Sequence, residues 1–334
     1  MADKSTIAVL GSGSWGTALA ILLGQNGHNI RLWGHLPAEI EALQRDRENK
    51  AFLPGVALPE TIHPQTDLER ALDGVTEVLI VVPSHAFRAV VTQMASLIDS
   101  RPGIAWATKG FEPGSQRLLS DVATELLPGR DLAVISGPTF AGEVARSLPT
   151  AVTVAASTQA HARRMADLLH APWFRAYTSE DLIGVQVGGA CKNVLAIATG
   201  IADGLGFGAN TRAALITRGL TEIMRLGICL GGNPETFMGL AGLGDLVLTC
   251  TDNQSRNRRM GLALAEGLSI AQARERIGQE VEGVHTAQEV YKLSRRHGVE
   301  MPISEQVYAV LYEQLNPTSA VHNLLERSQK PEGV

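Results

Sequence analysis

The first half of the chain alternates apolar runs with stretches of helical periodicity. The runs are rich in Val, Ile and Leu and nearly continuous, which is typical of strands buried on both faces. They predict strands at residues 7–10, 28–34, 77–82, 103–108, 131–135, 150–155 and 173–177. Because strands of this kind joined by helices form parallel sheets, we expect an α/β domain with a mostly parallel sheet.

The pattern changes near Asp181, where the strand signals stop and helical periodicity takes over. The predicted helices lie at residues 181–202, 211–230, 269–277, 286–297 and 303–315. A chain of 334 residues is long enough for two domains. We therefore predict an α/β domain over residues 1–185 and an all-α C-terminal domain over residues 186–334.

A glycine turn follows the first predicted strand, in the sequence STIAVLGSGSWGTALA at residues 5–20. Gly11 permits a tight turn, Gly13 lets the backbone approach a pyrophosphate, and Gly16 lets the next helix pack closely on the sheet. The free N–H groups at the start of that helix favour an anion. The turn predicts a Rossmann-type dinucleotide-binding domain rather than an ordinary glycine turn.

The end of the second predicted strand bears on which dinucleotide binds. An NAD-specific site carries an acid there for the ribose 2′-hydroxyl, but the first acid after this strand is Glu39. We therefore expect NADP(H) to be preferred, with NAD(H) also accepted. His35 is either a hydrogen-bond donor to the 2′-phosphate or a solvated loop residue, and the sequence supports the two interpretations about equally.

Three other predicted strands end in polar or glycine-containing loops, at Pro83-Ser84, Lys109-Gly110 and Gly137–Thr139. Ligands of parallel sheets bind beyond the carboxyl ends of the strands. We expect these loops to converge with the glycine turn on one crevice.

A lysine stands among small residues on the predicted helix 181–202. Gly188, Lys192 and Ala196 share one helix face by their spacing, and small neighbours leave room for a flat ring and a small substrate. Burial would lower the pKa of Lys192 towards neutrality and make it a proton donor for a carbonyl oxygen. A surface lysine on an amphipathic helix is the competing interpretation.

The segment from Gly239 to Gly261 combines glycines, one acid, Asp245, and a basic run. Arg256 offers a planar fork suited to a phosphate. We expect one of Arg256, Arg258 and Arg259 to be functional and the other two to be exposed.

Composition excludes several classes of function. The net charge of −5 gives no basic surface for nucleic acid, and no apolar run reaches the roughly 18 residues of a membrane span. The histidines and cysteines show no metal-site spacing, so no metal is expected. Three cysteines without a C-x-x-C pair and a first strand close to Met1 predict a cytoplasmic protein without a signal peptide.

The chain resembles bacterial NAD(P)-dependent glycerol-3-phosphate dehydrogenases over nearly its whole length. The resemblance rests on residues 11–20, 107–112, 136–145, 188–220 and 239–259, of which the last two are long and specific. It implies reduction of dihydroxyacetone phosphate to sn-glycerol 3-phosphate by NAD(P)H, in support of glycerophospholipid synthesis. It also suggests a homodimer.

The resemblance implies a role for individual residues. Lys192 matches the general acid/base, Lys109 a lysine shared by cofactor and substrate, and Asp245 a substrate-binding acid that orients Lys192. The other implied substrate contacts are Gly137, Thr139, Ser255, Arg256 and Asn257. The implied cofactor contacts are Ser14, Trp15, His35, Ala141, Arg256 and Glu282, beside Gly11, Gly13 and Gly16. Glu280 departs from the family pattern, which is apolar at this position.

Two other functions compete with this interpretation. A β-hydroxyacid dehydrogenase also joins a nucleotide domain to a helical domain with a lysine near an asparagine, but it acts on a carboxylate, and residues 239–259 argue against it. A nucleotide sensor without turnover would carry a further DNA- or partner-binding module, which the sequence does not show.

Overall fold

The structure is a computed structural model that describes residues 4–99 and 102–328. The N-terminal residues 1–3, used in predicting the absence of a signal peptide, lie outside the described residues. The chain forms two compact units. One comprises residues 1–108 and 119–182, and the other comprises residues 109–118 and 183–334.

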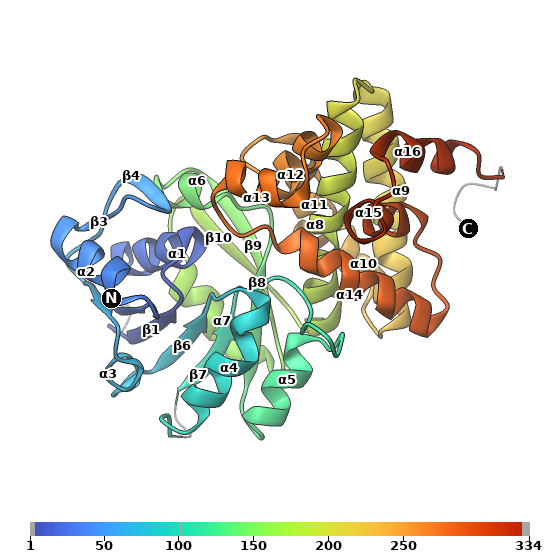
Figure 1. The fold of residues 1–334 in the computed structure, drawn as a ribbon. Coiled ribbons are helices and arrows are strands. Elements are labelled where there is room, and N and C mark those ends of the chain that lie inside the picture. The colour runs from blue at the N-terminus through green and yellow to red at the C-terminus, as the bar shows by residue number, and fades with distance from the viewer. Residues whose placement is uncertain (1–3, 100–101, 329–334) are drawn as a thin grey trace. The chain divides into compact units, whose positions relative to one another are not determined.

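The first unit is built on an eight-stranded sheet in the order β10-β9-β8-β7-β6-β1-β2-β5. Neighbouring strands pair in parallel except β8 and β9, which are antiparallel. The predicted mostly parallel sheet is confirmed. The strands are β1 (Thr6–Leu10), β2 (Asn29–Trp33), β5 (Ile62–Gln65), β6 (Glu77–Ile80), β7 (Gly103–Trp106), β8 (Leu132–Ser136), β9 (Thr150–Ala156) and β10 (Phe174–Ser179) (Figure 1).

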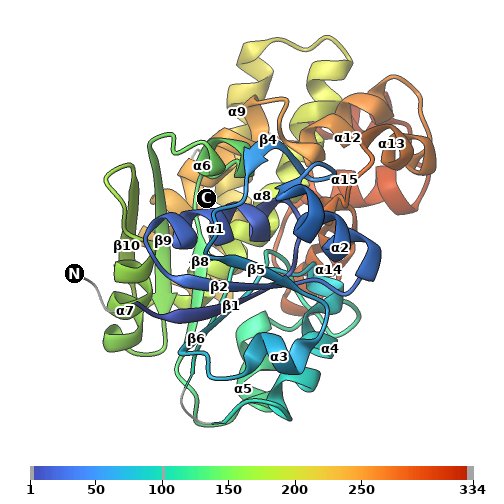
Figure 2. The same cartoon turned by 90° about the vertical axis from the view of Figure 1, so that its left-hand side faces the viewer.

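Helices cover both faces of this sheet, as its near-continuous apolar strands require. Helices α1, α6 and α7 pack together on one face, and α3, α4 and α5 on the other (Figure 2). The helices are α1 (Ser14–Gln25), α2 (Pro37–Asp46), α3 (Leu68–Leu72), α4 (Ser84–Ala95), α5 (Leu119–Leu126), α6 (Ala141–Ala145) and α7 (Gln159–Leu169). A small antiparallel pair, β3 (Glu48–Asn49) and β4 (Leu53–Ala57), completes the unit.

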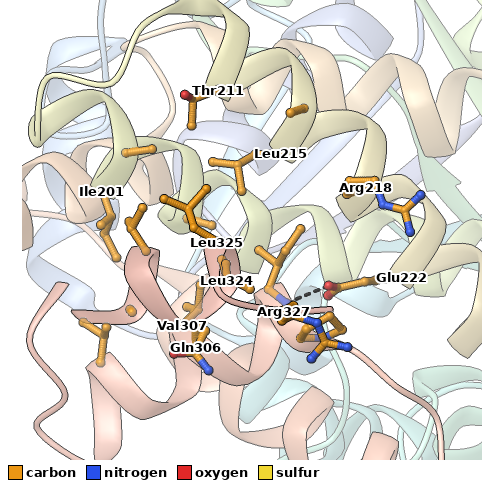
Figure 3. A pocket seen from close by; sticks show the side chains of 18 of the residues that line it. Ile201, Thr211, Leu215, Arg218, Glu222, Gln306, Val307, Leu324, Leu325 and Arg327 are labelled. Atoms are coloured by element: carbon orange, nitrogen blue, oxygen red, sulfur yellow. Dashed lines mark hydrogen bonds between the residues drawn. The ribbon is translucent and has the colours of Figure 1, made fainter. Parts of the chain in front are cut away.

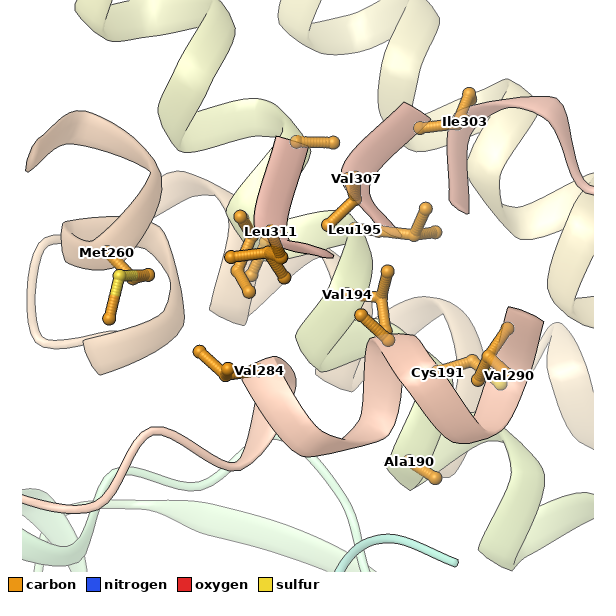
Figure 4. Close-up of a cluster of buried hydrophobic side chains, with 14 of the residues drawn as sticks. Ala190, Cys191, Val194, Leu195, Met260, Val284, Val290, Ile303, Val307 and Leu311 are labelled. Atoms are coloured by element: carbon orange, nitrogen blue, oxygen red, sulfur yellow. The ribbon is translucent and has the colours of Figure 1, made fainter. Parts of the chain in front are cut away.

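The second unit is helical, as predicted, apart from residues 109–118. Its elements are α8 (Leu182–Gly204, of which Leu182 falls in the first unit), α9 (Ala209–Cys229), α10 (Pro234–Phe237), the π-helical turn η1 (Leu240–Gly244), α11 (Asp245–Thr251), α12 (Arg256–Ala265), α13 (Ile270–Ile277), α14 (Glu282–His297), α15 (Pro302–Tyr312) and α16 (Pro317–Leu325). Val194 and Leu195 of α8 belong to the same buried apolar cluster as Val284 of α14 and Val307 of α15 (Figure 4).

Helix α8 is long and apolar enough to meet the length and composition of a membrane span, although the sequence pattern did not indicate a span there. Its most apolar window is 89% buried inside the protein. This burial marks α8 as the central core helix of the second unit.

Residues 109–118 leave the first unit after β7 and pack with the helices. Phe111 and Leu118 form an isolated antiparallel bridge, and both side chains are buried in the helical core. We call this segment the hairpin. The single domain boundary predicted near residue 185 puts the hairpin in the first domain. Periodicity could not assign the hairpin to the helical unit, because its docking depends on tertiary contacts.

Candidate functional site

The predicted site residues fall into two groups, one in each unit. The first unit holds the glycine turn, His35, Gly137, Thr139 and Ala141. The second unit holds Lys109, Lys192, Asp245, Ser255, Arg256, Asn257 and Glu282.

The three glycines of the turn differ in what surrounds them. Gly11 has φ +124°, and a Cβ there would lie 2.5 Å from the Val81 carbonyl oxygen. A Cβ on Gly16 would lie 1.9 Å from the Gly11 oxygen, so a side chain there would separate α1 from the turn. A Cβ on Gly13 would meet nothing within 4 Å. The space beside Gly13 is therefore open, as close approach of a phosphate requires.

At the start of α1, neither a capping side chain nor an acid competes with an anion for the backbone N–H groups. Its N-cap, Gly13, has no side chain to cap the helix, and no acid stands in the first turn. The first N–H groups of a helix have no partner within the helix. Ser14 begins α1, and the indole Nε1 of Trp15 is buried without a hydrogen-bond partner. These features suit an anionic cofactor.

Asn49 supports the turn from β3 and was missed by sequence reasoning. Its Nδ2 donates to the Ser12 carbonyl oxygen at 2.8 Å and to Thr17 Oγ1 at 2.7 Å. Asn49 and Thr17 are both buried. No pattern marks an asparagine some distance beyond the turn, because the contact depends on the unpredicted strand β3.

The other first-unit residues lie in loops after strands. His35 is exposed between β2 and α2. Gly137, in the loop after β8, has φ +153°, and a Cβ there would lie 2.9 Å from Val152 Cα. Thr139 Oγ1 donates to the Gly137 carbonyl oxygen at 3.2 Å. Ala141 begins α6, which packs on α1.

In the second unit two lysines share one buried carboxylate. Asp245, the first residue of α11, is fully buried. Lys109 Nζ lies 2.6 Å from Asp245 Oδ2, and Lys192 Nζ donates to Asp245 Oδ1. The side chains of Lys109 and Lys192 are 17% and 7% exposed. The sequence named all three residues, and the structure brings them together.

Burial lowers the pKa of Lys192 to about 7, although Asp245 acts to raise it, and the charge of Lys109 lowers it further. Lys192 Nζ also donates to Thr249 Oγ1 at 2.9 Å, and Thr249 donates to the Asp245 carbonyl oxygen at 2.6 Å. Thr249 was missed by sequence reasoning. Its position four residues after Asp245 on a helix was the available signal.

Glycines set how closely the backbone approaches this cluster. A Cβ on Gly188 would lie 2.6 Å from the Ala241 carbonyl oxygen. Gly188 therefore admits the π-helical turn η1 against α8, immediately before Asp245. Our interpretation that small neighbours leave room for a ligand ring is wrong for Gly188, because protein backbone fills that space.

The predicted phosphate contacts stand at the start of α12. Ser255 is the N-cap, and its Oγ accepts from Arg258 N at 3.2 Å. Arg256 follows as a half-buried cation, whose pKa is lowered by burial against the opposing effect of Glu282. The amide of Asn257 is engaged within the protein, donating to Asn193 Oδ1 and accepting from Gly283 N, each at 2.9 Å.

The basic run differs from its prediction. Arg258 is buried and forms an ion pair with Asp203, which also pairs with Arg212 at 2.9 Å. Arg259 is half-buried. The expectation that two of the three arginines are exposed is therefore wrong, because α12 packs closely against α8. A Cβ on Gly200 of α8 would lie 2.1 Å from the Arg258 carbonyl oxygen.

The residues at the start of α14 complete the second group. Glu282 is its first helical residue and interacts electrostatically with Arg256. Glu280 lies just before it, with its Oε1 3.6 Å from His285 Nε2.

Two further observations concern a possible metal site and a cavity. Within residues 4–99 and 102–328, no group of three or more His, Cys, Asp or Glu side chains is placed to hold a metal ion. A cavity of about 580 Å³ lies between α8, α9, α15 and α16, with Leu215, Arg218 and Glu222 on its wall (Figure 3). None of the predicted site residues lines it.

Comparison with known proteins assigns the chain to a family. Sequence models of the N-terminus and C-terminus of NAD-dependent glycerol-3-phosphate dehydrogenase match residues 6–162 and 181–322. The chain belongs to the NAD-dependent glycerol-3-phosphate dehydrogenase family. Family members named glycerol-3-phosphate dehydrogenase with NAD(P)+ include one from Shewanella halifaxensis, 54% identical over 99% of this chain and 98% of that relative. Another, from Xanthomonas campestris pv. campestris, is 54% identical over 98% of this chain and 96% of that relative.

Solved structures of the family agree. The glycerol-3-phosphate dehydrogenase of Coxiella burnetii is 51% identical, with a TM-score of 0.95 over 97% of this chain and 99% of that one. The yeast enzyme is 28% identical, with a TM-score of 0.82 over 97% of this chain and 100% of that one. A D-mandelate dehydrogenase is 14% identical with a TM-score of 0.62, a likeness that shows the fold alone.

Proposed function

We propose that this chain reduces the C2 carbonyl of dihydroxyacetone phosphate to sn-glycerol 3-phosphate with NAD(P)H. The observation that carries the proposal is the buried Lys109–Asp245–Lys192 cluster in a chain of this family. The β-hydroxyacid dehydrogenase alternative is not favoured, because family membership extends over both halves of the chain.

The glycine turn is the part of the chain that fits the cofactor pyrophosphate. The open space beside Gly13 allows the close approach of that group, and the uncapped start of α1 favours its negative charge. A bound NAD(P)H supplies the hydride. Residues proposed to hold it are Gly11, Gly13, Ser14, Trp15, Gly16, His35 and Ala141 of the first unit and Lys109, Arg256 and Glu282 of the second. Residues 1–185 are accordingly proposed as the dinucleotide-binding domain, with the hairpin as a separate contribution from the helical unit.

Lys192 is the proposed proton donor. An amine with a pKa of about 7 is partly protonated near neutral pH. It can give its proton to the carbonyl oxygen, which takes up the π electrons of the C=O bond as the hydride adds to C2. Lys109, paired with Asp245, stabilises negative charge on the same oxygen. Asp245 holds both ammonium groups and fixes their separation.

The start of α12 is the proposed phosphate site. Arg256 supplies a cation, and the first backbone N–H groups of α12 supply donors and the positive end of the helix dipole. Because the Asn257 side chain is engaged with Asn193, its proposed contribution is through its backbone N–H. Gly137 and Thr139 are the proposed substrate contacts of the first unit.

The test is a spectrophotometric assay of dihydroxyacetone phosphate reduction with NADPH and with NADH. Lys192→Ala should abolish most of kcat while leaving the Kd for NADPH near the wild-type value. Lys292→Ala, which removes an exposed lysine of α14, is the matched control. Wild-type kcat in Lys192→Ala would rule out its role as proton donor.

Three further proposals follow from the assigned reaction and the family. The product feeds glycerophospholipid synthesis, the protein acts in the cytoplasm, and it forms a homodimer. Glycerol auxotrophy of a deletion strain, cell fractionation and sedimentation equilibrium test these proposals in turn.

A further inference from the structure

The hairpin carries Lys109 at its start and is anchored at its base. Glu112 N donates to the Arg117 carbonyl oxygen at 2.9 Å, next to the bridge between Phe111 and Leu118. Phe111 and Leu118 are 1% and 7% exposed within the helical core. These contacts attach the hairpin to the second unit, but apolar contacts are not directional and do not fix its orientation.

The tip of the hairpin is fixed by a buried amide. Gln116 is 5% exposed, and its Nε2 donates to Glu289 Oε2 of α14 at 2.8 Å. Its Oε1 accepts from Arg296, which lies about two turns further along α14. Glu289 is itself 3% exposed. Both ends of the Gln116 amide are therefore held by the same helix.

The backbone at the tip is also unusual. Gln116 has φ +61°, a left-handed conformation that residues with a Cβ seldom adopt. Such a conformation persists where the surroundings over-determine it. A buried polar group that is fully bonded gives a directional restraint that apolar packing lacks.

We propose that Gln116, held by Glu289 and Arg296, is a positioning residue that keeps the Lys109 ammonium on Asp245 and so beside Lys192. Gln116 lies in the tip of the hairpin and Lys109 at its start, and both are fixed to the helical unit, Gln116 on α14 and Lys109 on α11. The kinetic consequence of this positioning rests on the function proposed above, whereas the placement of Lys109 itself does not.

The variant that isolates the amide is Gln116→Gly. Glycine accepts a left-handed backbone, so this change removes the side-chain bonds without adding backbone strain. Gln314→Gly is the matched control, because Gln314 also has a left-handed backbone, φ +59°, and is exposed in the same unit. Glu289→Ala removes the partner, and Glu289→Gln keeps an acceptor for the Gln116 amide.

The first readout is acetylation of Lys109 by a water-soluble ester, followed by mass spectrometry with the other lysines as internal references. We expect the Lys109 rate to rise several-fold in Gln116→Gly and Glu289→Ala and to stay at the wild-type value in Gln314→Gly. Glu289→Gln should remain near wild type. An unchanged Lys109 rate in Gln116→Gly, or an equal rise in Gln314→Gly, would overturn the proposal.

The second readout is kinetic. Misplacement of Lys109 should lower kcat for dihydroxyacetone phosphate by about 10- to 100-fold in Gln116→Gly. Because Lys109 is also a proposed cofactor contact, the Kd for NADPH should rise, but by a smaller factor. Because the charge of Lys109 lowers the pKa of Lys192, the loss of activity at high pH should move to higher pH, which simple destabilisation would not cause. If the wild-type protein reduces no dihydroxyacetone phosphate, the proposed function fails, while the acetylation result still decides the role of Gln116.

Discussion

Replacing Asp245 by Asn tests the electrostatics of the buried cluster. Asp245 is the fully buried anion between two ammonium groups, with Lys109 Nζ at 2.6 Å. An opposite charge this close changes the pKa of its neighbour by about 1–3. Loss of the carboxylate should lower the pKa of Lys192 from about 7 by that amount, because burial and the charge of Lys109 then act unopposed.

The sign of the effect on activity follows from the role of the proton. Reduction needs protonated Lys192, so its rate falls as pH rises through the pKa, and this fall should move to lower pH in Asp245→Asn. At pH 7 the protonated fraction is about one half in the wild type, and it drops roughly tenfold each time the pKa falls by about one. For a pKa decrease of about 1–3, we expect kcat/KM for dihydroxyacetone phosphate to be about 5- to 500-fold lower at neutral pH and closer to wild type at acidic pH.

The assay is initial-rate NADPH oxidation across the pH range in which the protein stays folded, with folding checked by circular dichroism at each pH. Asp73→Asn, which changes an exposed aspartate of the first unit, is the control. A loss of activity that is the same at every pH would refute the reasoning, because it would mean that Asp245 acts without setting the pKa of Lys192.

Three other predictions address separate features. Arg256→Ala should raise the KM for dihydroxyacetone phosphate far more than the KM for NADPH, and equal increases would assign Arg256 to the cofactor. His35→Asp should shift preference from NADPH to NADH, since an acid repels a 2′-phosphate; an unchanged ratio of the two kcat/KM values excludes His35 from that contact. Burial raises the pKa of Glu77 from 4.5 to about 7 although Arg164 opposes the shift, so the folded form loses about 3 kcal/mol of stability as pH rises from 4.5 to 7. Glu77→Gln should remove this slope, as measured by urea unfolding at pH 5 and pH 8.

The parts of the fold that sequence predicted are those with strong periodicity. The apolar runs located all seven predicted strands of the main sheet to within about two residues at either end. Strands β4 and β5 were missed because LPGVA and IHPQ contain residues that weaken strand patterns. The helices η1, α11 and α12 were missed because glycines and charges interrupt the apolar repeat there.

The site was predicted mainly as a set of residues, and the resemblance implied one pairing, Asp245 with Lys192, which the structure shows. Lys192 and Asp245 stand in recognisable segments, so their identities were readable. The contribution of Thr249, the backbone contact at Gly188 and the burial of Arg258 each arise where two helices meet. Pairings of this kind are tertiary. Only Thr249 had a local signal, its position four residues after Asp245, and that signal does not indicate the contact with Lys192.

The hairpin at residues 109–118 also determines how members of this family could be recombined. The chain crosses between the two units after residues 108, 118 and 182. A chimaera joined once near residue 182 would take Lys109 from one parent and Lys192 and Asp245 from the other, and would pair Gln116 with a foreign α14. Exchange of whole units therefore needs three junctions, so that the short insert is inherited together with the helices on which it docks.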